Sequence, residues 1–213
     1  MLYLLNHPKE VLTLLLQHLQ MTATAVAIAT ALAVPLTLTI QRYRWLAGPV
    51  MGLLGILYTI PSLALIIFLV PLFGLNATSV VVAMVVYTQV ILVRNLSVGL
   101  SGIAPAVIEA ARGMGMNPWQ RWWRIQIPLA LPVFVAGVRI AAIVAVSIAT
   151  IGAKFNAGGL GKLLFDGIQT NRYDKIWAGA IAVATLAFGL NALLLWLEKH
   201  SNPAAKIKAA AKP

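Results

Sequence analysis

The sequence predicts an all-α integral membrane protein with about five transmembrane helices, and three observations support this fold class. Of the 213 residues, 61% are hydrophobic and only 10% are charged. Long stretches of the chain contain no charged residue. A soluble domain of this length could not remove so much apolar surface from water. The composition therefore excludes a water-soluble globular protein and indicates one membrane-embedded unit.

The uncharged stretches define the predicted spans, because a helix needs about 20 apolar residues to cross a hydrocarbon core about 30 Å thick. The stretch from Val11 to Gln41 is longer than a signal-peptide core and is followed by arginines, which is a stop-transfer pattern. The stretch from Trp45 to Val93 is long enough for two spans, and residues 71–76 separate them with Pro, Gly and Asn. We predict spans at residues 21–40, 49–70, 77–94, 132–153 and 176–197.

The basic residues predict how these spans are oriented. The formal net charge is +11, from 16 Lys and Arg against five Asp and Glu. Because the basic residues lie between apolar stretches, they indicate membrane orientation and lipid contact rather than nucleic-acid binding. If residues 95–131 are cytoplasmic, eleven basic residues lie inside and five outside, which predicts an outer N-terminus and an inner C-terminus. The predicted parts are an outer segment at 1–20, a transmembrane domain at 21–197 and a basic, disordered tail at 198–213.

Ionisable residues inside a membrane are costly, so each one needs an explanation. Arg139 lies in the fourth span and either snorkels to the inner surface or faces the interior of the bundle. No acidic residue lies within a predicted span, so we expect no ion pair inside the membrane. The same feature disfavours a proton-coupled carrier and an ATP-independent channel. The chain has no cysteine, and its three histidines lie near the two ends, at His7, His18 and His200. These features disfavour a metal site and an intramembrane enzyme.

The most informative segment is residues 109–128, which read EAARGMGMNPWQRWWRIQIP. The segment starts as a helix, has a turn signal at Asn117-Pro118, and continues as a helical stretch rich in Trp and Arg. A helix, a turn and an amphipathic helix in succession lie along a membrane surface or dock into the groove of a partner. The residue pattern alone leaves both interpretations open.

The spacing within this segment resembles the cytoplasmic loop of permease subunits in binding-protein-dependent ABC importers. The signature of that family is Glu-Ala-Ala, three residues, Gly, nine residues, Ile, one residue and Leu-Pro. This chain keeps the same spacings, with isoleucine in place of the leucine, at Glu109, Ala110, Ala111, Gly115, Ile125, Ile127 and Pro128.

The resemblance implies that this loop, between the third and fourth spans, is a coupling helix that docks on an ATPase subunit. Glu109 would offer a charge to a basic residue of the ATPase, and Ala110 and Ala111 would let the two backbones approach closely. Gly115 would permit the turn, and Pro128 would fix the entry into the fourth span. The implied partners are an ABC ATPase dimer, a second copy or paralogue of the permease, and an extracytoplasmic solute-binding protein. ATP and magnesium would bind to the ATPase, and this chain would carry no catalytic site, cofactor or metal.

The wider chain is similar to the branch of this family that imports osmoprotectants such as glycine betaine, carnitine and choline across the bacterial inner membrane. The similarity is carried by IPSLALIIFLVPLFGLN at 60–76, EAARGMGMNPWQ at 109–120 and ATIGAKFNAGGLGKLLFDGI at 149–168. That branch usually has small or apolar residues before AGGLG, whereas this chain has Lys154-Phe155-Asn156. A lysine at the outer mouth would repel a cation such as choline, so the alternative is a zwitterion, an amino acid or another small polar solute.

Three residues are therefore candidates for the pathway or the outer loop: Lys154, Asn156 and Arg139. The glycine-rich run at 158–161 lacks the spacing of a phosphate-binding loop. We expect it to form a flexible break before a short outer helix at 163–169, where the solute-binding protein would dock.

Overall fold

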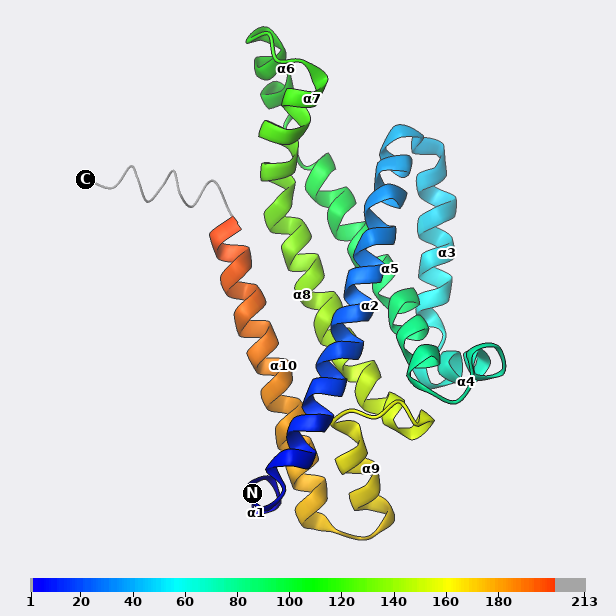
Figure 1. Cartoon of the computed structure of the whole chain (residues 1–213). Coiled ribbons are helices and arrows are strands. Elements are labelled where there is room, and N and C mark those ends of the chain that lie inside the picture. The colour runs from blue at the N-terminus through cyan, green and yellow to red at the C-terminus, as the bar shows by residue number, and fades with distance from the viewer. Residues whose placement is uncertain (1, 202–213) are drawn as a thin grey trace, which may run out of the picture.

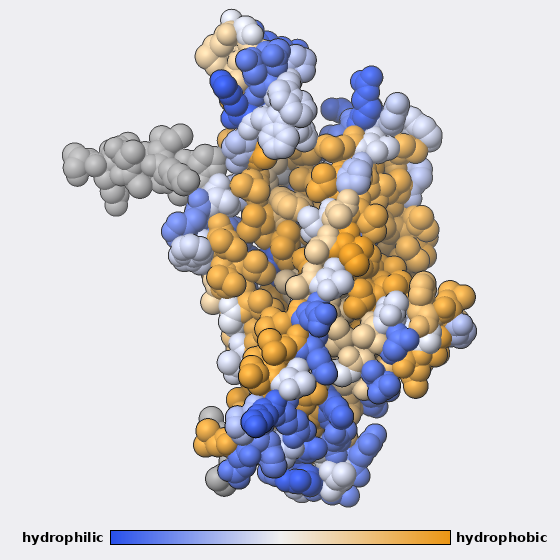
Figure 2. All heavy atoms as spheres, viewed as in Figure 1, coloured by the Kyte–Doolittle hydropathy of each residue, from blue (hydrophilic) through white to orange (hydrophobic). Residues whose placement is uncertain are grey.

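The computed structural model describes residues 2–201, and every regular element within that range is a helix. The long or apolar helices are α2 (Pro8–Arg42), α3 (Ala47–Thr59), α4 (Ser62–Phe73), α5 (Ala77–Ser101), α8 (Ile127–Gly152) and α10 (Tyr173–Ser201). The short helices lie at the two ends of the bundle (Figure 1): α1 (Leu2–Asn6), α6 (Pro105–Gly113), α7 (Pro118–Arg121) and α9 (Gly161–Gln169). Figure 2 shows a broad hydrophobic band between two hydrophilic ends, as a membrane protein requires.

The predicted fold class is confirmed. Four helical stretches are long and apolar enough to cross a membrane, and the bent pair α3–α4 makes a fifth if it counts as one span. The segment that carries α6 and α7 lies between α5 and α8, as the sequence predicts. We call the end of the bundle that carries this segment the α6 end, and the opposite end, with α1 and α9, the α9 end (Figure 1).

Helices α2, α5 and α8 form the centre of the bundle through small side chains. Ala25, Ala29 and Ala33 follow one face of α2 and are fully buried, and a second alanine stripe on α8 is buried as well. Small side chains at a spacing of four let helix backbones approach closely where no hydrophobic effect drives association. An interhelical hydrogen bond supports this contact, because the Gln89 amide of α5 donates to the Ala29 carbonyl of α2 at 3.0 Å.

The second predicted span is not one straight helix, so the prediction for residues 49–70 is wrong in this respect. α3 ends at Thr59, and α4 leaves at an angle of 96°. Pro61 has no backbone N–H and pushes the preceding residue out of the helical region, and Ile60 accordingly has an extended backbone. Pro71, which lies in the predicted break at 71–76, is instead inside α4.

The fourth predicted span starts earlier than residue 132. α7, a π-helical segment at Trp122–Gln126 and α8 form one helical stretch that continues to Phe155. The N–H of Ile127 donates to the carbonyl of Trp122, five residues back, instead of the usual four. Pro128 follows directly and cannot donate a helical hydrogen bond, so the wider turn accommodates the proline without ending the helix.

One ion pair joins two of the long helices, although no acidic residue lies within a predicted span. α10 continues past residue 197 to Ser201, so Glu198 belongs to the helix rather than to a tail. The Arg139 side chain of α8 donates from Nε to Glu198 Oε2 at 3.0 Å and from Nη1 to Asn191 Oδ1 at 3.2 Å. The pair was missed because the predicted span ended one residue before the carboxylate. The rest of the predicted tail, residues 202–213, lies outside the described residues.

Candidate functional site

The segment between α5 and α8 projects beyond the bundle at the α6 end (Figure 1). Pro105 is the first residue of α6, where its missing N–H costs no helical hydrogen bond. Glu109 and Ala110 are exposed on α6, whereas Ala111 is 1% exposed. The two predicted contact alanines therefore differ, because Ala111 is covered by its own chain and only Ala110 is open to a partner.

Gly115 ends α6 with a Schellman motif. The N–H of Met116 donates to the Ala111 carbonyl at 3.1 Å, and the N–H of Gly115 donates to the Arg112 carbonyl at 2.9 Å. This pattern places the residue after the helix cap in the left-handed region, where Gly115 has φ of +78°. Glycine is favoured there because it has no Cβ to clash with the backbone. The three residues between Glu-Ala-Ala and Gly115 therefore allow one more helical turn before Gly115 ends α6.

Changing Gly115 to alanine should loosen this turn. The left-handed conformation costs a residue with a Cβ about 1–2 kcal/mol. We expect the Gly115→Ala variant to insert normally but to lose several-fold in transport, measured as solute uptake per inserted protein. Gly113→Ala is the matched control, because Gly113 is the last residue of α6 and a Cβ added there would meet only open space. Equal uptake losses in the two variants would contradict the role of the left-handed turn.

After the turn, α7 starts with a capping box. The Asn117 side chain accepts the N–H of Gln120, and the Gln120 side chain accepts the N–H of Asn117. On either side of this start and within it, large apolar side chains are exposed: Met114, Trp119 and Trp123 are 72%, 69% and 52% exposed. Large exposed apolar side chains mark surfaces that contact a protein partner or lipid. This arrangement is suited to docking and force transmission.

The inner side of the segment packs toward the bundle. Trp122 and Ile127 line an apolar cavity of about 200 Å³ together with residues of α2, α5 and α8, namely Val34, Leu38, Leu96, Leu100, Ala130, Leu131 and Phe134. Ile125 and Pro128 are half-buried nearby in the sequence. Trp122 and Ile127 therefore face the helices that form the centre of the bundle.

The predicted outer-loop residues lie together at the α9 end. Lys154 belongs to a short 3-10 turn at Ala153–Phe155, and Asn156 follows it in the left-handed conformation with φ of 57°. Both residues line one polar hollow of about 720 Å³, while the predicted short helix is observed as α9. Arg139 is not part of this hollow, because it lies about 20 Å away along α8 at 1.5 Å per residue.

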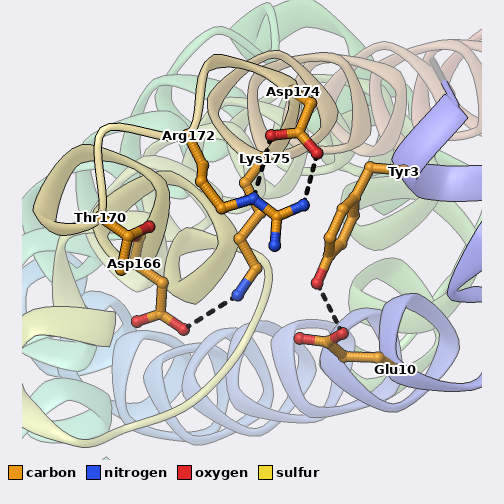
Figure 3. A network of polar contacts seen from close by, with 7 residues as sticks. All are labelled: Tyr3, Glu10, Asp166, Thr170, Arg172, Asp174 and Lys175. Carbon is orange, nitrogen blue, oxygen red and sulfur yellow. Dashed lines mark hydrogen bonds and ion pairs between the residues drawn. The ribbon is translucent and has the colours of Figure 1, made fainter.

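The N-terminal helix lies against the α9–α10 turn, because the Arg172 guanidinium lies over the Tyr3 ring at 5.4 Å, and three polar contacts surround this pair (Figure 3). The Tyr3 hydroxyl donates to Glu10 at 2.8 Å, Arg172 pairs with Asp174 at 2.7 Å, and Lys175 lies 3.6 Å from Asp166. Burial, reinforced by the Glu10 carboxylate, raises the pKa of Tyr3 to about 12. The hydroxyl therefore keeps donating to Glu10 in alkaline solution, where a tyrosine with the ordinary pKa of 10 would be ionised.

Sequence reasoning missed two neighbours that hold the glycine-rich loop in place. Gln17 Oε1 accepts the N–H of Gly159 at 3.0 Å, and His18 Nδ1 accepts the N–H of Leu160 at 3.3 Å. The other ring nitrogen of His18 is 3.2 Å from the Val146 carbonyl and, with Nδ1 accepting, donates to it. His18 is fully buried, and a lone histidine at the start of an apolar stretch was the one available signal. The loop is therefore fixed to α2 and α8, not a flexible break.

Sequence comparison identifies related proteins along nearly the whole chain. The chain is 39% identical over 206 residues to the osmoprotectant import permease protein OsmW of Salmonella typhimurium, covering 94% of this chain and 96% of that protein. It is 34% identical to the choline transport system permease protein OpuBD of Bacillus subtilis, covering 92% and 87%. It is 35% identical to the carnitine transport permease protein OpuCD of Listeria monocytogenes, with the same coverage.

Structural comparison agrees at the level of the fold. A structure of the MetNI methionine ABC transporter in an inward-facing conformation matches with a TM-score of 0.78 at 20% identity, over 92% of this chain and 99% of that chain. An amino acid ABC transporter crystallised with histidines matches with a TM-score of 0.70 at 19% identity, over 93% and 95%. Residues 23–207 match the family described as the binding-protein-dependent transport system inner membrane component. The chain is thus a multi-pass inner-membrane protein that belongs to the family of binding-protein-dependent transport system inner membrane components.

Proposed function

We propose that this chain is the permease subunit of an ABC importer that moves a small osmoprotectant, such as glycine betaine, carnitine or choline, across the cytoplasmic membrane. The observation that carries the proposal is the similarity to osmoprotectant, choline and carnitine permeases over nearly the full chain. The Glu-Ala-Ala segment supports it, because it is displayed on a projecting helix with an exposed apolar surface.

The α6 end faces the cytoplasm in this proposal, and the segment from Glu109 to Pro128 docks on the partner ATPase. ATP and magnesium bind to that partner, whose closure pushes on α6 and α7. The segment passes the displacement to α2, α5 and α8 through the contacts around Trp122 and Ile127. The pathway then opens alternately to the two sides, between this chain and a second permease that is a copy or a paralogue.

The amino acid alternative differs only in the solute. Lys154 in the outer hollow disfavours a purely cationic solute and is compatible with any small zwitterion. Competition of labelled glycine betaine uptake by unlabelled choline, carnitine, methionine and histidine separates the two. Displacement by the betaine analogues supports the osmoprotectant assignment, whereas displacement by the amino acids alone would replace it.

Single cysteines test the orientation and the docking surface, because the natural sequence contains none. In intact cells, a membrane-impermeant maleimide should label the Lys162→Cys variant at the α9 end and leave Ala110→Cys unlabelled. In inside-out vesicles, bound ATPase should slow the labelling of Ala110→Cys severalfold. Arg44→Cys is the matched control, since Arg44 is exposed in the turn between α2 and α3. Figure 1 shows this turn at the same end of the bundle, outside the projecting segment.

Two results would contradict this proposal. Labelling of Ala110→Cys in intact cells would reverse the orientation. Equal protection of Ala110→Cys and Arg44→Cys by the ATPase would mean that the projecting segment is not the specific docking surface.

A further inference from the structure

The α9 end contains a polar hollow of about 720 Å³ that the coupling mechanism does not use. We call it the basic hollow, because three different elements each contribute one lysine to its wall. Lys9 comes from the start of α2, Lys154 from the 3-10 turn after α8, and Lys162 from α9. The wall also includes Glu10, Gln17, Asn156, Gly158 and Asp166. Figure 2 shows the hydrophilic surface at this end of the molecule.

The charges of the basic hollow are unevenly neutralised. Both carboxylates in its wall have other partners: Glu10 accepts the Tyr3 hydroxyl at 2.8 Å, and Asp166 lies 3.6 Å from Lys175, which is outside the lining (Figure 3). Within residues 2–201, none of the three lining lysines forms an ion pair. The Lys154 amine lies over the Phe165 ring at 4.8 Å, which keeps it near the wall. The three ammonium groups therefore create a positive potential that an anionic group would relieve.

The wall between α8 and α9 is fixed rather than adaptable. Gln17 and His18 accept the N–H groups of Gly159 and Leu160, and Gly158 has φ of +79°. A Cβ on Gly158 would collide with Gln17, so the loop and α2 fit together closely at the base of the hollow. The position of Lys154 and Asn156 relative to α2 is therefore set before any ligand arrives, which lowers the entropy cost of binding.

The composition of the wall is compatible with an anionic group such as a carboxylate. Three lysines and two carboxylates give the lining a net charge near +1, which favours an anion over a cation. Asn156 adds an amide that can donate to a carboxylate oxygen.

We propose that the basic hollow is a binding site for a carboxylate group on the outer face of the permease. This inference rests on the proposed importer function, which provides two sources of that group. One source is the carboxylate of a zwitterionic solute such as glycine betaine or carnitine, which choline lacks. The other is an acidic side chain of the docking solute-binding protein.

The test uses the complete complex of permease, ATPase and solute-binding protein. The Lys154→Gln, Lys162→Gln double variant removes two of the three charges, and the Lys154→Arg, Lys162→Arg double variant keeps them. Arg172→Gln is the matched control, because it removes an outer positive charge that is paired with Asp174 and does not line the hollow. Uptake of labelled glycine betaine and choline is measured together with the Kd of the purified binding protein for the complex.

In the glutamine double variant, either the KM for glycine betaine or the Kd of the binding protein should rise about fivefold. This is the effect expected for the loss of two exposed charge contacts. A higher KM for glycine betaine with unchanged choline uptake and unchanged Kd assigns the carboxylate to the solute. A higher Kd of the binding protein, equal for both solutes, assigns it to the protein. In either case the arginine variant should behave like the wild type.

Two results would overturn the inference. One is an unchanged KM and Kd in the glutamine double variant. The other is an equal loss in Arg172→Gln, which would show a general effect of surface charge. Failure of the proposed function would give a different result from failure of this inference. The wild-type complex would then take up none of these solutes, while the Kd of the binding protein could still be compared between variants.

Discussion

Replacing Glu109 with lysine should abolish ATP-driven uptake while leaving insertion of the protein in the membrane intact. Glu109 is exposed on α6, so the substitution does not disturb the packing of the bundle. At a docking surface that offers Glu109 a positive partner, the new lysine would face a like charge. Reversing one charge of a desolvated interface pair costs about 2–5 kcal/mol, and at the upper end this corresponds to a loss of more than a thousandfold in affinity.

The effect of Glu109→Lys is measured by copurification of the ATPase with the tagged permease and by solute uptake. Val107→Lys is the control, because it introduces the same charge at another exposed position of α6. Glu109→Gln should show an intermediate loss, since it removes the attraction without adding repulsion. Normal copurification and uptake by Glu109→Lys would show that this carboxylate has no part in docking.

Breaking the ion pair between Arg139 and Glu198 should produce the largest loss of stability. The two side chains are each 25% exposed and join α8 to the end of α10, which otherwise buries only Ala178 and Gly179. The Glu198→Leu substitution removes the carboxylate and leaves the Arg139 guanidinium with its hydrogen bond to Asn191. We expect destabilisation on the order of 1–3 kcal/mol, less than for a fully buried pair because the site is partly exposed.

A double-mutant cycle isolates this interaction. The Arg139→Leu, Glu198→Leu double variant should recover much of the stability lost in Glu198→Leu, because no charge then remains without its partner. The measurement is thermal unfolding of the purified protein in detergent. Lys199→Leu is the control, since Lys199 is exposed and adjacent to Glu198. Strictly additive losses in the cycle would show that the two side chains do not stabilise each other.

Hydropathy predicted the fold class, and four of the five predicted spans correspond to long apolar helices, since the cost of burying charge in lipid dominates every other preference. It could not predict the 96° bend between α3 and α4, because apolar composition does not report helix direction. Pro61 was the available signal, whereas the turn residues at 71–76 suggested a later break. The π-helical turn before Pro128 could not be predicted either, because a proline at this position usually marks the start of a helix.

The candidate sites were predictable to different extents. The turn after α6 follows from local sequence, because Gly115 and the Asn117–Gln120 capping box act within a few residues of each other. Lys154 and Asn156 were singled out because they differ from the small or apolar residues that the resembled branch usually has before AGGLG. Their neighbours on α2 could not be predicted, since Gln17 lies 142 residues from the glycine whose N–H it accepts. Contacts of that kind depend on how α2 and α8 pack, which no local pattern specifies.

We propose that this chain forms the membrane pathway of an ATP-driven, binding-protein-dependent importer. This role is measured most directly as uptake of labelled glycine betaine into proteoliposomes that contain this permease and its ATPase, with the binding protein outside and ATP inside. We expect saturable uptake that requires ATP, the binding protein and an intact Glu109. Uptake that persists without ATP or without the binding protein would contradict it and would indicate a channel or carrier.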